Sequence, residues 1–321
     1  MWNLELEPDS TLGLGIDAGG TQTRWALAEP DGTIVAEGQV AGLSALQMSS
    51  GSGRQAVYAN FAMLAQAVLV HGRPSKVRAG LTGFGGDGEQ LQRWLSELLQ
   101  IRTRAITLSN DIEIAYLGSF APGEGYLVYA GTGSIGAWID EQRVFHRAGG
   151  RGVMLDDGGG GFWIAREALR LIWRNEDERP GAWQDSPMAR AVFAHIGGED
   201  WSLSRQFIYG QERGEVGKLA LAVAASADAD PAAMAILRGA GEELARLGKA
   251  LISRFGPRPV VLAGRASELH PIIEQTMRAA MPADIALTQA VGQAHYAAAR
   301  IAAKENMGSG PTDLTPPLSP T

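Results

Sequence analysis

Residues 15–24 combine the residue types that a turn needs to bind phosphate beside a metal ion. An apolar run precedes this segment and another follows it, which predicts a strand, a tight turn and a second strand. The candidates for chemistry in it are Asp17, Gly19, Gly20, Thr21 and Thr23. Glycine lets backbone N–H groups converge on an anion, threonine adds hydroxyl donors, and a carboxylate can hold Mg²⁺ through water. We therefore predict a phosphate turn with Mg²⁺ beside it, although an ordinary glycine hairpin has the same signature.

Two better-known phosphate loops do not fit this segment. A Walker A loop needs a lysine, and residues 15–24 contain none. Gly13, Gly15 and Ala18 satisfy the spacing of a dinucleotide-binding loop, but that loop must open a helix. The apolar residues 25–28 that follow predict a strand instead, so we expect neither loop here.

A second glycine and threonine turn occurs later in the chain in similar surroundings. It consists of Gly131, Thr132, Gly133 and Ser134. The apolar residues 126–130 precede it, and two further strands are predicted within residues 135–147. This order of strand, turn, strand, turn and strand repeats the order around the first turn. The chain therefore looks like two related halves.

A third candidate for chemistry is Asp111, which follows the apolar strand predicted at residues 105–108. A carboxylate at a strand end can accept the proton of a hydroxyl group as its oxygen attacks. Asp is also among the preferred residues at a helix N-cap, and residues 112–117 look like the start of a helix. From the residues alone, both roles of Asp111 stay open.

The elements around these residues predict an α/β protein. Three meander strands come first, the third at residues 33–38, and helices then alternate with strands, which is typical of a mixed sheet covered by helices. Residues 41–53 and 175–185 are predicted to be loops because they are rich in small or polar residues. Helices are predicted at residues 55–70, 162–173, 188–196, 201–209, 216–225 and 231–255.

The length of 321 residues predicts two domains. We place them at residues 1–117 and 118–305, with a last helix at about residues 290–304 that can pack back on the first domain. Residues 306–321 are rich in Gly, Pro, Ser and Thr, so we expect a disordered tail.

The composition excludes several classes of protein. Hydrophobic residues make up 45% and charged residues 20% of the chain, which is a globular balance. The net charge of −7 argues against nucleic acid or an anionic membrane as a partner. The absence of cysteine excludes disulfides, thiolate metal sites and iron–sulfur clusters, and the histidines lack metal-ligand spacing. With neither a secretory signal nor a long apolar run in the sequence, we expect a cytoplasmic protein.

Together these segments resemble the sugar kinase, Hsp70 and actin superfamily, and within it the branch of N-acetylglucosamine kinases and BadF/BadG-type ATPases. Residues 17–21 are similar to its first phosphate motif and residues 131–134 to its second. Asp111, in Ser109-Asn110-Asp111, falls where that branch has its catalytic aspartate. Other similar segments are residues 149–152, Asp157 and residues 162–165 around the sugar, 260–264 at the adenosine, and 290–294 with the closing helix to Ala303.

The resemblance implies a two-domain actin-like ATPase fold, which is ribonuclease H-like, with duplicated mixed-sheet domains and a central cleft. It implies ATP- and Mg²⁺-dependent phosphorylation of an amino sugar, foremost N-acetylglucosamine to N-acetylglucosamine 6-phosphate, by a homodimer. Asp111 would be the base, and Asp17 would hold Mg²⁺ through water. The implied ATP-binding residues are Gly19, Gly20, Thr21, Thr23, Gly131, Thr132, Gly133, Ser134 and Gly264. The implied sugar-binding residues are Ser44, Asp111, Gly150, Arg151 and Asp157.

Near the sugar, the chain departs from the pattern of N-acetylglucosamine kinases. It has Gly150-Arg151-Gly152 where they usually have Gly-Trp-Gly, and residues 156–160 read Asp-Asp-Gly-Gly-Gly where they usually read Gly-Asp-Glu-Gly-Ser. The loop at residues 42–46 lacks the asparagine expected near the sugar. Arg151 is either a surface residue or a partner for a negatively charged substituent. These departures affect the choice of substrate more than the phosphoryl chemistry.

Three functions remain open at this point. The first is a kinase for N-acetylglucosamine, for glucosamine or for another hexosamine. The second is an ATPase that activates a dehydratase, but such relatives hold an iron–sulfur cluster with cysteines, which this chain lacks. The third is a non-catalytic regulator that binds sugar or nucleotide.

Overall fold

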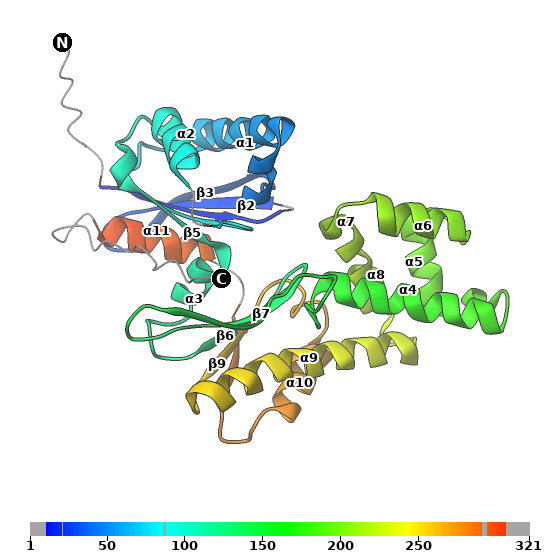
Figure 1. Cartoon of the computed structure of the whole chain (residues 1–321). Coiled ribbons are helices and arrows are strands. Elements are labelled where there is room, and N and C mark those ends of the chain that lie inside the picture. Colours follow the sequence, from blue (N-terminus) through cyan, green and yellow to red (C-terminus); the bar gives the residue numbers. More distant parts are fainter. Residues whose placement is uncertain (1–10, 21, 86–87, 291–293, 306–321) are drawn as a thin grey trace, which may run out of the picture. The chain divides into compact units, whose positions relative to one another are not determined.

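The computed structural model of the chain describes residues 11–20, 22–85, 88–290 and 294–305 (Figure 1). The chain forms two compact units. Unit 1 comprises Met1–Gly118 together with Gln293–Thr321, and unit 2 comprises Ser119–Gly292. Thr21, residues 291–293 of the closing motif and the predicted tail at residues 306–321 lie outside the described residues.

Unit 1 is built on a five-stranded mixed sheet. Its strands are β1 (Gly13–Ala18), β2 (Gln22–Ala28), β3 (Ile34–Ala41), β4 (Lys76–Leu81) and β5 (Ile106–Asn110). They lie in the order β3-β2-β1-β4-β5. The first three strands pair antiparallel, whereas β1, β4 and β5 run parallel. The carboxyl ends of these three parallel strands therefore meet at one edge of the sheet, where α/β sheets usually bind ligands.

Helices cover both faces of this sheet (Figure 1). On one face, α1 (Gly51–Leu69) and α2 (Glu89–Leu99) form a buried core with the strands. On the other face, α11 (Ala294–Lys304) lies directly over β1. A Cβ atom at Gly13 would lie 2.1 Å from the Ala303 nitrogen, and one at Gly15 would lie 2.1 Å from the His295 carbonyl oxygen. The two glycines that mimic a dinucleotide loop therefore serve this close helix packing.

Unit 2 repeats the same sheet with different strands. These are β6 (Tyr126–Ala130), β7 (Ser134–Ile139), β8 (Phe145–Gly149), β9 (Val260–Ala263) and β10 (Leu287–Ala290), in the order β10-β9-β6-β7-β8. The strands β6, β7 and β8 pair antiparallel, and β6, β9 and β10 pair in parallel, as in unit 1. The prediction of an α/β fold with duplicated mixed sheets is confirmed.

Between β8 and β9 the chain of unit 2 is helical. The helices are α4 (Gly161–Glu178), α5 (Pro187–Ile196), α6 (Trp201–Gly210), α7 (Arg213–Gly217), α8 (Leu219–Ser226) and α9 (Pro231–Phe255). The long helix α9 packs on β6, β7 and β8. Asp230 joins two helix ends, because its carboxylate accepts the N–H of Met188 in α5 at 2.9 Å and the N–H of Ala232 in α9 at 3.0 Å. This shared cap joins the start of α5 to the start of α9.

The loop predicted at residues 41–53 is wrong in most of its length. Strand β3 extends to Ala41, a 3-10 helix η1 (Ala45–Ser49) follows, and α1 already begins at Gly51. Ser44 caps η1 by accepting the N–H of Leu46 at 3.3 Å, and Ser50 caps α1 by accepting the N–H of Gly53 at 3.0 Å. Two of the serines that indicated a loop, Ser44 and Ser50, are therefore helix caps.

Other predicted boundaries differ in unit 2. The prediction of a loop at residues 175–185 is wrong, because α4 continues to Glu178 and a 3-10 helix η3 (Ala182–Asp185) follows. The Glu176 carboxylate accepts the N–H groups of Gly181 and Trp183 at 2.8 and 2.7 Å and so fixes this turn. The single helix predicted at residues 216–225 is two helices, α7 and α8. Helix α10 (Pro271–Ala280) and strand β10 had no predicted counterpart.

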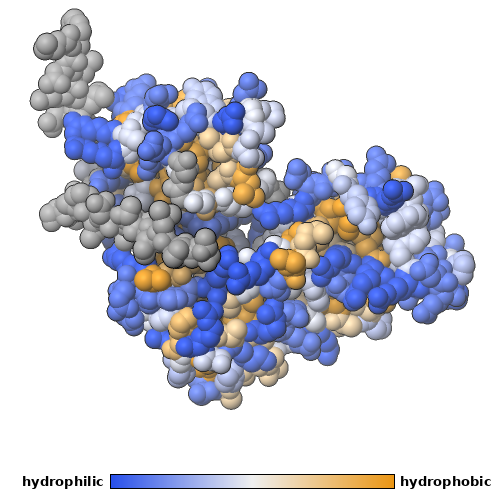
Figure 2. All heavy atoms as spheres, in the orientation of Figure 1, coloured by the Kyte–Doolittle hydropathy of each residue, from blue (hydrophilic) through white to orange (hydrophobic). Residues whose placement is uncertain are grey.

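Hydrophilic side chains cover most of the face shown in Figure 2, with hydrophobic ones in smaller patches. Among the described helices, none is by itself both long and apolar enough to cross a membrane. The bent pair formed by residues 213–226 and 231–255 meets those two criteria together.

Candidate active site

In unit 1, the predicted residues gather at the carboxyl edge of the parallel strands. Asp17 is the penultimate residue of β1, and Asp111 directly follows β5. Strand β4 lies between these two strands, and Thr82 directly follows it. The sheet thus brings two half-buried carboxylates and a hydroxyl to one edge. Thr82 was missed at the sequence level, because a threonine before a glycine-rich turn has no distinctive pattern.

The first phosphate turn follows β1 directly. The Gly19 N–H donates to the Gln22 carbonyl at 3.0 Å, which closes the turn, and the Gly19 carbonyl accepts the Leu43 N–H at 3.0 Å. Gly20 faces open space, since a Cβ atom there would meet nothing within 4 Å. Thr21 lies outside the described residues. The Thr23 side chain is fully buried, and its hydroxyl has no partner within the described part of the chain.

Asp111 is the first residue of α3 (Asp111–Leu117), and Asn110 is the N-cap of that helix. The Asn110 side chain accepts the N–H of Ile112 at 2.9 Å, and Asp111 Oδ1 shares this donor at 3.0 Å. The Thr82 hydroxyl donates to Asp111 Oδ2. The cap that was the alternative role of Asp111 is thus filled by its neighbour. Both carboxylate oxygens of Asp111 therefore accept hydrogen bonds from within unit 1.

Ser44 has structural partners. Besides capping η1, its hydroxyl donates to the Thr82 carbonyl at 3.1 Å. A sugar contact by this hydroxyl would have to use its remaining lone pair.

In unit 2, the second phosphate turn is joined to the start of α4. The Gly131 N–H donates across the turn to the Gly133 carbonyl at 2.9 Å. The Gly131 carbonyl accepts the Gly161 N–H at 2.8 Å, and the Thr132 carbonyl accepts the Phe162 N–H at 2.9 Å. The carbonyl groups of the turn thus satisfy the first N–H groups of α4, which lacks a side-chain cap.

Two more bonds join this turn to the glycine-rich segment that precedes α4. The buried Ser134 hydroxyl donates to the Gly158 carbonyl at 2.6 Å, so the predicted phosphate donor is used inside the unit. A Cβ atom at Gly160 would lie 2.6 Å from the Gly133 carbonyl carbon. Only glycine lets the two segments lie this close together.

Asp157 is buried rather than presented to solvent. Its backbone is left-handed, with φ of 59°, and its Oδ1 accepts the Gly152 N–H at 3.0 Å. A Cβ atom at Gly133 would lie 2.2 Å from Asp157 Oδ2, so the carboxylate packs against the phosphate turn. Burial raises the pKa of the Asp157 carboxyl, and the charge of Asp156 adds to this, while the Gly152 N–H and Arg213 oppose it. Asp157 thus links the loop around Gly152 to the second phosphate turn.

The remaining predicted residues of unit 2 are two glycines with positive φ and an exposed arginine. Gly264 follows β9 with φ of +97°, and a Cβ atom there would lie 2.4 Å from the Ala130 carbonyl oxygen. Gly150 has φ of +63°, and its Cβ would lie 2.7 Å from Cδ1 of Ile135. Arg151, beside it, is exposed. These two glycines cannot be replaced without backbone strain.

The residues of unit 1 fit a phosphate-bound magnesium ion. Among the described residues, no group of three His, Cys, Asp or Glu side chains gathers to form a metal site of its own. Mg²⁺ commonly binds through substrate phosphates, water and one or two carboxylates instead. Asp17 lies two residues before the turn at Gly19, so it is one carboxylate of the kind that Mg²⁺ uses.

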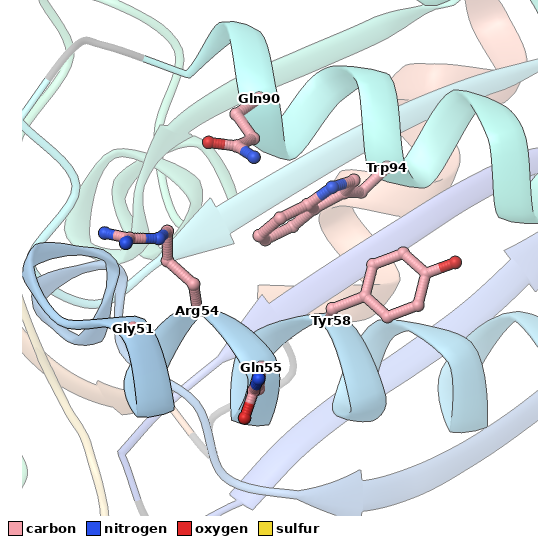
Figure 3. A pocket seen from close by; sticks show the side chains of 6 residues that line it. All are labelled: Gly51, Arg54, Gln55, Tyr58, Gln90 and Trp94. Carbon is pink, nitrogen blue, oxygen red and sulfur yellow. The ribbon is translucent and has the colours of Figure 1, made fainter.

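A separate pocket of about 470 Å³ lies between α1 and α2 on unit 1 (Figure 3). It is lined by Gly51, Arg54, Gln55, Tyr58, Gln90 and Trp94. The rings of Tyr58 and Trp94 meet edge to face, with centroids 5.4 Å apart. It contains no carboxylate and none of the predicted residues, so the candidate site is assigned to the sheet edge instead.

Comparisons with known proteins agree with this assignment of fold. The chain resembles a solved protein from Chromobacterium violaceum, provisionally identified as an N-acetylglucosamine kinase, with 26% identity and a TM-score of 0.66 over 93% of this chain and 100% of that one. A ROK family glucokinase from Streptomyces griseus, solved with glucose and AMPPNP, has the same fold, with 17% identity and a TM-score of 0.57 over 92% and 98% of the two chains.

A curated relative is the N-acetylmuramic acid/N-acetylglucosamine kinase of Clostridium acetobutylicum, which is 35% identical over 74 residues. This match spans 23% of the present chain and 24% of the relative. The family model of the BadF/BadG/BcrA/BcrD ATPases matches residues 14–297, which is most of the chain. The chain therefore belongs to the BadF/BadG/BcrA/BcrD ATPase family.

Proposed function

We propose that this chain is an ATP-dependent sugar kinase that phosphorylates a hydroxyl of an amino sugar, with N-acetylglucosamine as the first candidate. The observation that carries the proposal is the sheet edge of unit 1, where Asp111 lies on the same edge as the turn at Gly19 and Gly20. Asn110 is the N-cap of α3, and the Thr82 hydroxyl holds the neighbouring Asp111 carboxylate at this edge. The family, and the kinases among the similar proteins, support the same reaction.

In the proposed reaction, the oxygen of the sugar hydroxyl attacks the γ-phosphorus of ATP, and Asp111 accepts the proton of that hydroxyl. A new oxygen–phosphorus bond forms, the bond from the γ-phosphorus to the bridging oxygen breaks, and ADP leaves. In unit 1 the Gly20 N–H would hold a phosphate oxygen, because the Gly19 N–H already closes the turn. In unit 2 the N–H groups of Thr132 and Gly133 would have the same role, because the Gly131 N–H is likewise used within its turn. Bound Mg²⁺ would neutralise phosphate charge, and Asp17 would hold it through water. Such a reaction depends mainly on positioning.

A second substrate class follows from Arg151. This side chain is exposed beside Gly150 and Gly152, which both have positive φ, so it is free to reach toward a ligand. A guanidinium group pairs well with a carboxylate. The lactyl carboxylate of N-acetylmuramic acid is such a group, and the curated relative bears that substrate in its name. We propose N-acetylmuramic acid as the second candidate.

The test is ADP release from ATP and Mg²⁺ with a panel of sugars: N-acetylglucosamine, glucosamine, glucose, N-acetylmuramic acid and N-acetylmannosamine. Strong stimulation by one amino sugar, with its phosphorylated product seen by mass spectrometry, supports the proposal. ADP release that none of the sugars changes contradicts it and favours the ATPase or regulator. If N-acetylmuramic acid alone stimulates, Arg151→Met should raise its KM, while Arg143→Met serves as a matched control at another exposed arginine.

A further inference from the structure

The N–H and the carbonyl of Thr82 both form hydrogen bonds to other segments of unit 1. Its N–H donates to the Ala18 carbonyl at the end of β1, at 2.9 Å. Its carbonyl accepts the Ala45 N–H at 2.9 Å and the Ser44 hydroxyl at 3.1 Å. Both backbone groups of Thr82 are therefore used, one toward the phosphate turn and one toward the loop that precedes η1.

A fixed backbone also fixes the direction of the side chain. Threonine is branched at Cβ, which restricts its χ1 angle to few rotamers. In the rotamer observed, the Thr82 hydroxyl donates to Asp111 Oδ2. Asp111 stands at the first position of α3, where its Oδ1 accepts the Ile112 N–H at 3.0 Å, and the Thr82 hydroxyl adds a bond at the other carboxylate oxygen. The hydroxyl thus selects one orientation of that carboxylate.

We propose that Thr82 is a positioning residue, which holds the Asp111 carboxylate in the orientation that accepts the proton of the sugar hydroxyl. This inference rests on the proposed kinase function, because it assigns Thr82 a task in that reaction. A general base works only when its oxygen lies within hydrogen-bonding reach of the proton that it takes. Loss of the orienting bond therefore lowers the rate of the chemical step and leaves the binding of sugar and ATP intact.

The experiment compares Thr82→Val, Thr82→Ser and the control Thr107→Val in the full chain. Valine keeps the shape of threonine and removes the hydroxyl, whereas serine keeps the hydroxyl. We expect Thr82→Val to lower kcat about tenfold to a hundredfold, with both KM values within about twofold of the parent. Thr82→Ser should recover most of that loss, and Thr107→Val, a half-buried threonine in β5, should behave as the parent.

Several outcomes would overturn the proposal. One is an unchanged kcat in Thr82→Val, and another is an equal loss in the serine variant, which would show that the backbone rather than the hydroxyl matters. In a double-mutant cycle, Thr82→Val should cost little once Asp111→Asn is present, and a fully additive loss would also contradict the proposal. Failure of the kinase proposal is seen separately, as a parent protein that phosphorylates no sugar. In that case, a crystal structure of Thr82→Val decides, since an unmoved Asp111 carboxylate would overturn the positioning role.

Discussion

The two units have the same sheet topology, but different residues lie at the carboxyl ends of its parallel strands. In both, the residue after the first parallel strand is a glycine whose N–H donates back across a turn: Gly19 to Gln22 and Gly131 to Gly133. In both, the carbonyl that ends that strand accepts an N–H from the segment after the neighbouring parallel strand, at 2.9 Å. The donors are Thr82 in unit 1 and Ala266 in unit 2. The same two backbone hydrogen bonds therefore hold the turn after the first parallel strand in both units.

The difference lies in the residue that directly follows that neighbouring strand. Unit 1 has Thr82 there, with a hydroxyl that donates to Asp111. Unit 2 has Gly264, whose missing side chain leaves its backbone packed against the Ala130 carbonyl. Unit 1 thus offers side chains suited to proton transfer, whereas unit 2 offers bare backbone suited to close approach. We therefore propose that the two copies of the sheet serve different tasks, and the predictions below test this division.

The largest effect is expected from Asp111→Asn. The amide keeps the shape of the carboxylate but cannot accept the sugar proton, so kcat should fall about a thousandfold, within the usual range for a general base. Steady-state kinetics with the active sugar would measure this. Asp284→Asn, at an exposed aspartate in unit 2, is the matched control and should leave kcat unchanged. If Asp111→Asn kept full activity, Asp111 would not be the base, and the proposed difference between the two units would be wrong.

Gly264→Ala should give the next largest effect, on stability. The new Cβ would overlap the Ala130 carbonyl on a backbone with positive φ, which should cost about 3 kcal/mol in unfolding free energy. Urea denaturation would measure it. Gly181→Ala is the matched control, because Gly181 also has positive φ but a Cβ there meets nothing within 4 Å. That variant should lose only about 1 kcal/mol. Equal losses would show that close approach does not matter at Gly264.

His295 should make the stability of unit 1 sensitive to acid. Burial, helped by the charge of Arg24 and opposed by that of Glu37, lowers the pKa of His295 to about 4. The unfolded chain binds a proton at its ordinary pKa of about 6.5, so stability is lost as the pH falls from there toward 4. Between about pH 6.5 and about pH 5 the loss should be about 2 kcal/mol. His295→Gln should show a smaller loss in urea titrations over this range, and an equal loss would refute the assignment.

The smallest effect is expected from Asp157→Asn. Asparagine tolerates the left-handed backbone and still accepts the Gly152 N–H, but it carries no charge. Because burial raises the pKa of the Asp157 carboxyl, its charge disfavours folding above the ordinary pKa. The variant should therefore be slightly more stable than the parent at neutral pH, and this gain should vanish in acid. Asp157→Gly, which also suits positive φ but lacks the acceptor, should be less stable than Asp157→Asn.

The Asp157→Asn variant also distinguishes a structural role of Asp157 from a direct role in sugar binding. If the carboxylate only joins the loop at Gly152 to the phosphate turn, Asp157→Asn should keep the sugar KM of the parent. A large rise in that KM would instead indicate a direct bond from Asp157 to a sugar hydroxyl. Isothermal titration with the active sugar gives the same distinction without turnover.

The alternation of apolar strands and glycine turns was enough to predict the duplication and most strands of the two sheets. Long apolar periodicity also predicted α9 at its observed bounds, Pro231–Phe255. The serine-rich residues before α1 were misread, because a serine that caps a helix and a serine in a loop have the same local composition. Strand β10 was missed because only its first residue is buried and two others are exposed, so it lacks the alternation of a half-buried strand.

Side-chain partners in the candidate site were less predictable than the fold. The sequence pointed to Asp17, Gly19 and Asp111, and the sheet does bring their strands to one edge. It could not tell that Ser134 bonds Gly158, because that bond depends on a close approach of two turns far apart along the chain. Nor could the sequence separate Gly13 and Gly15, against which α11 packs, from glycines that bind a phosphate. In both uses the requirement is the absence of a side chain.

The packing of α11 on β1 has a consequence for how the protein is made. A ribosome synthesises β1 before unit 2 but α11 only after all of unit 2. Until then, the glycine face of β1 lacks its cover, and buried alanines such as Ala26 and Ala28 are open to water. Unit 2 is continuous in the chain, so it can fold before unit 1, which needs α11 to be complete. The face of β1 and β2 that α11 covers is thus the last part of unit 1 to be buried.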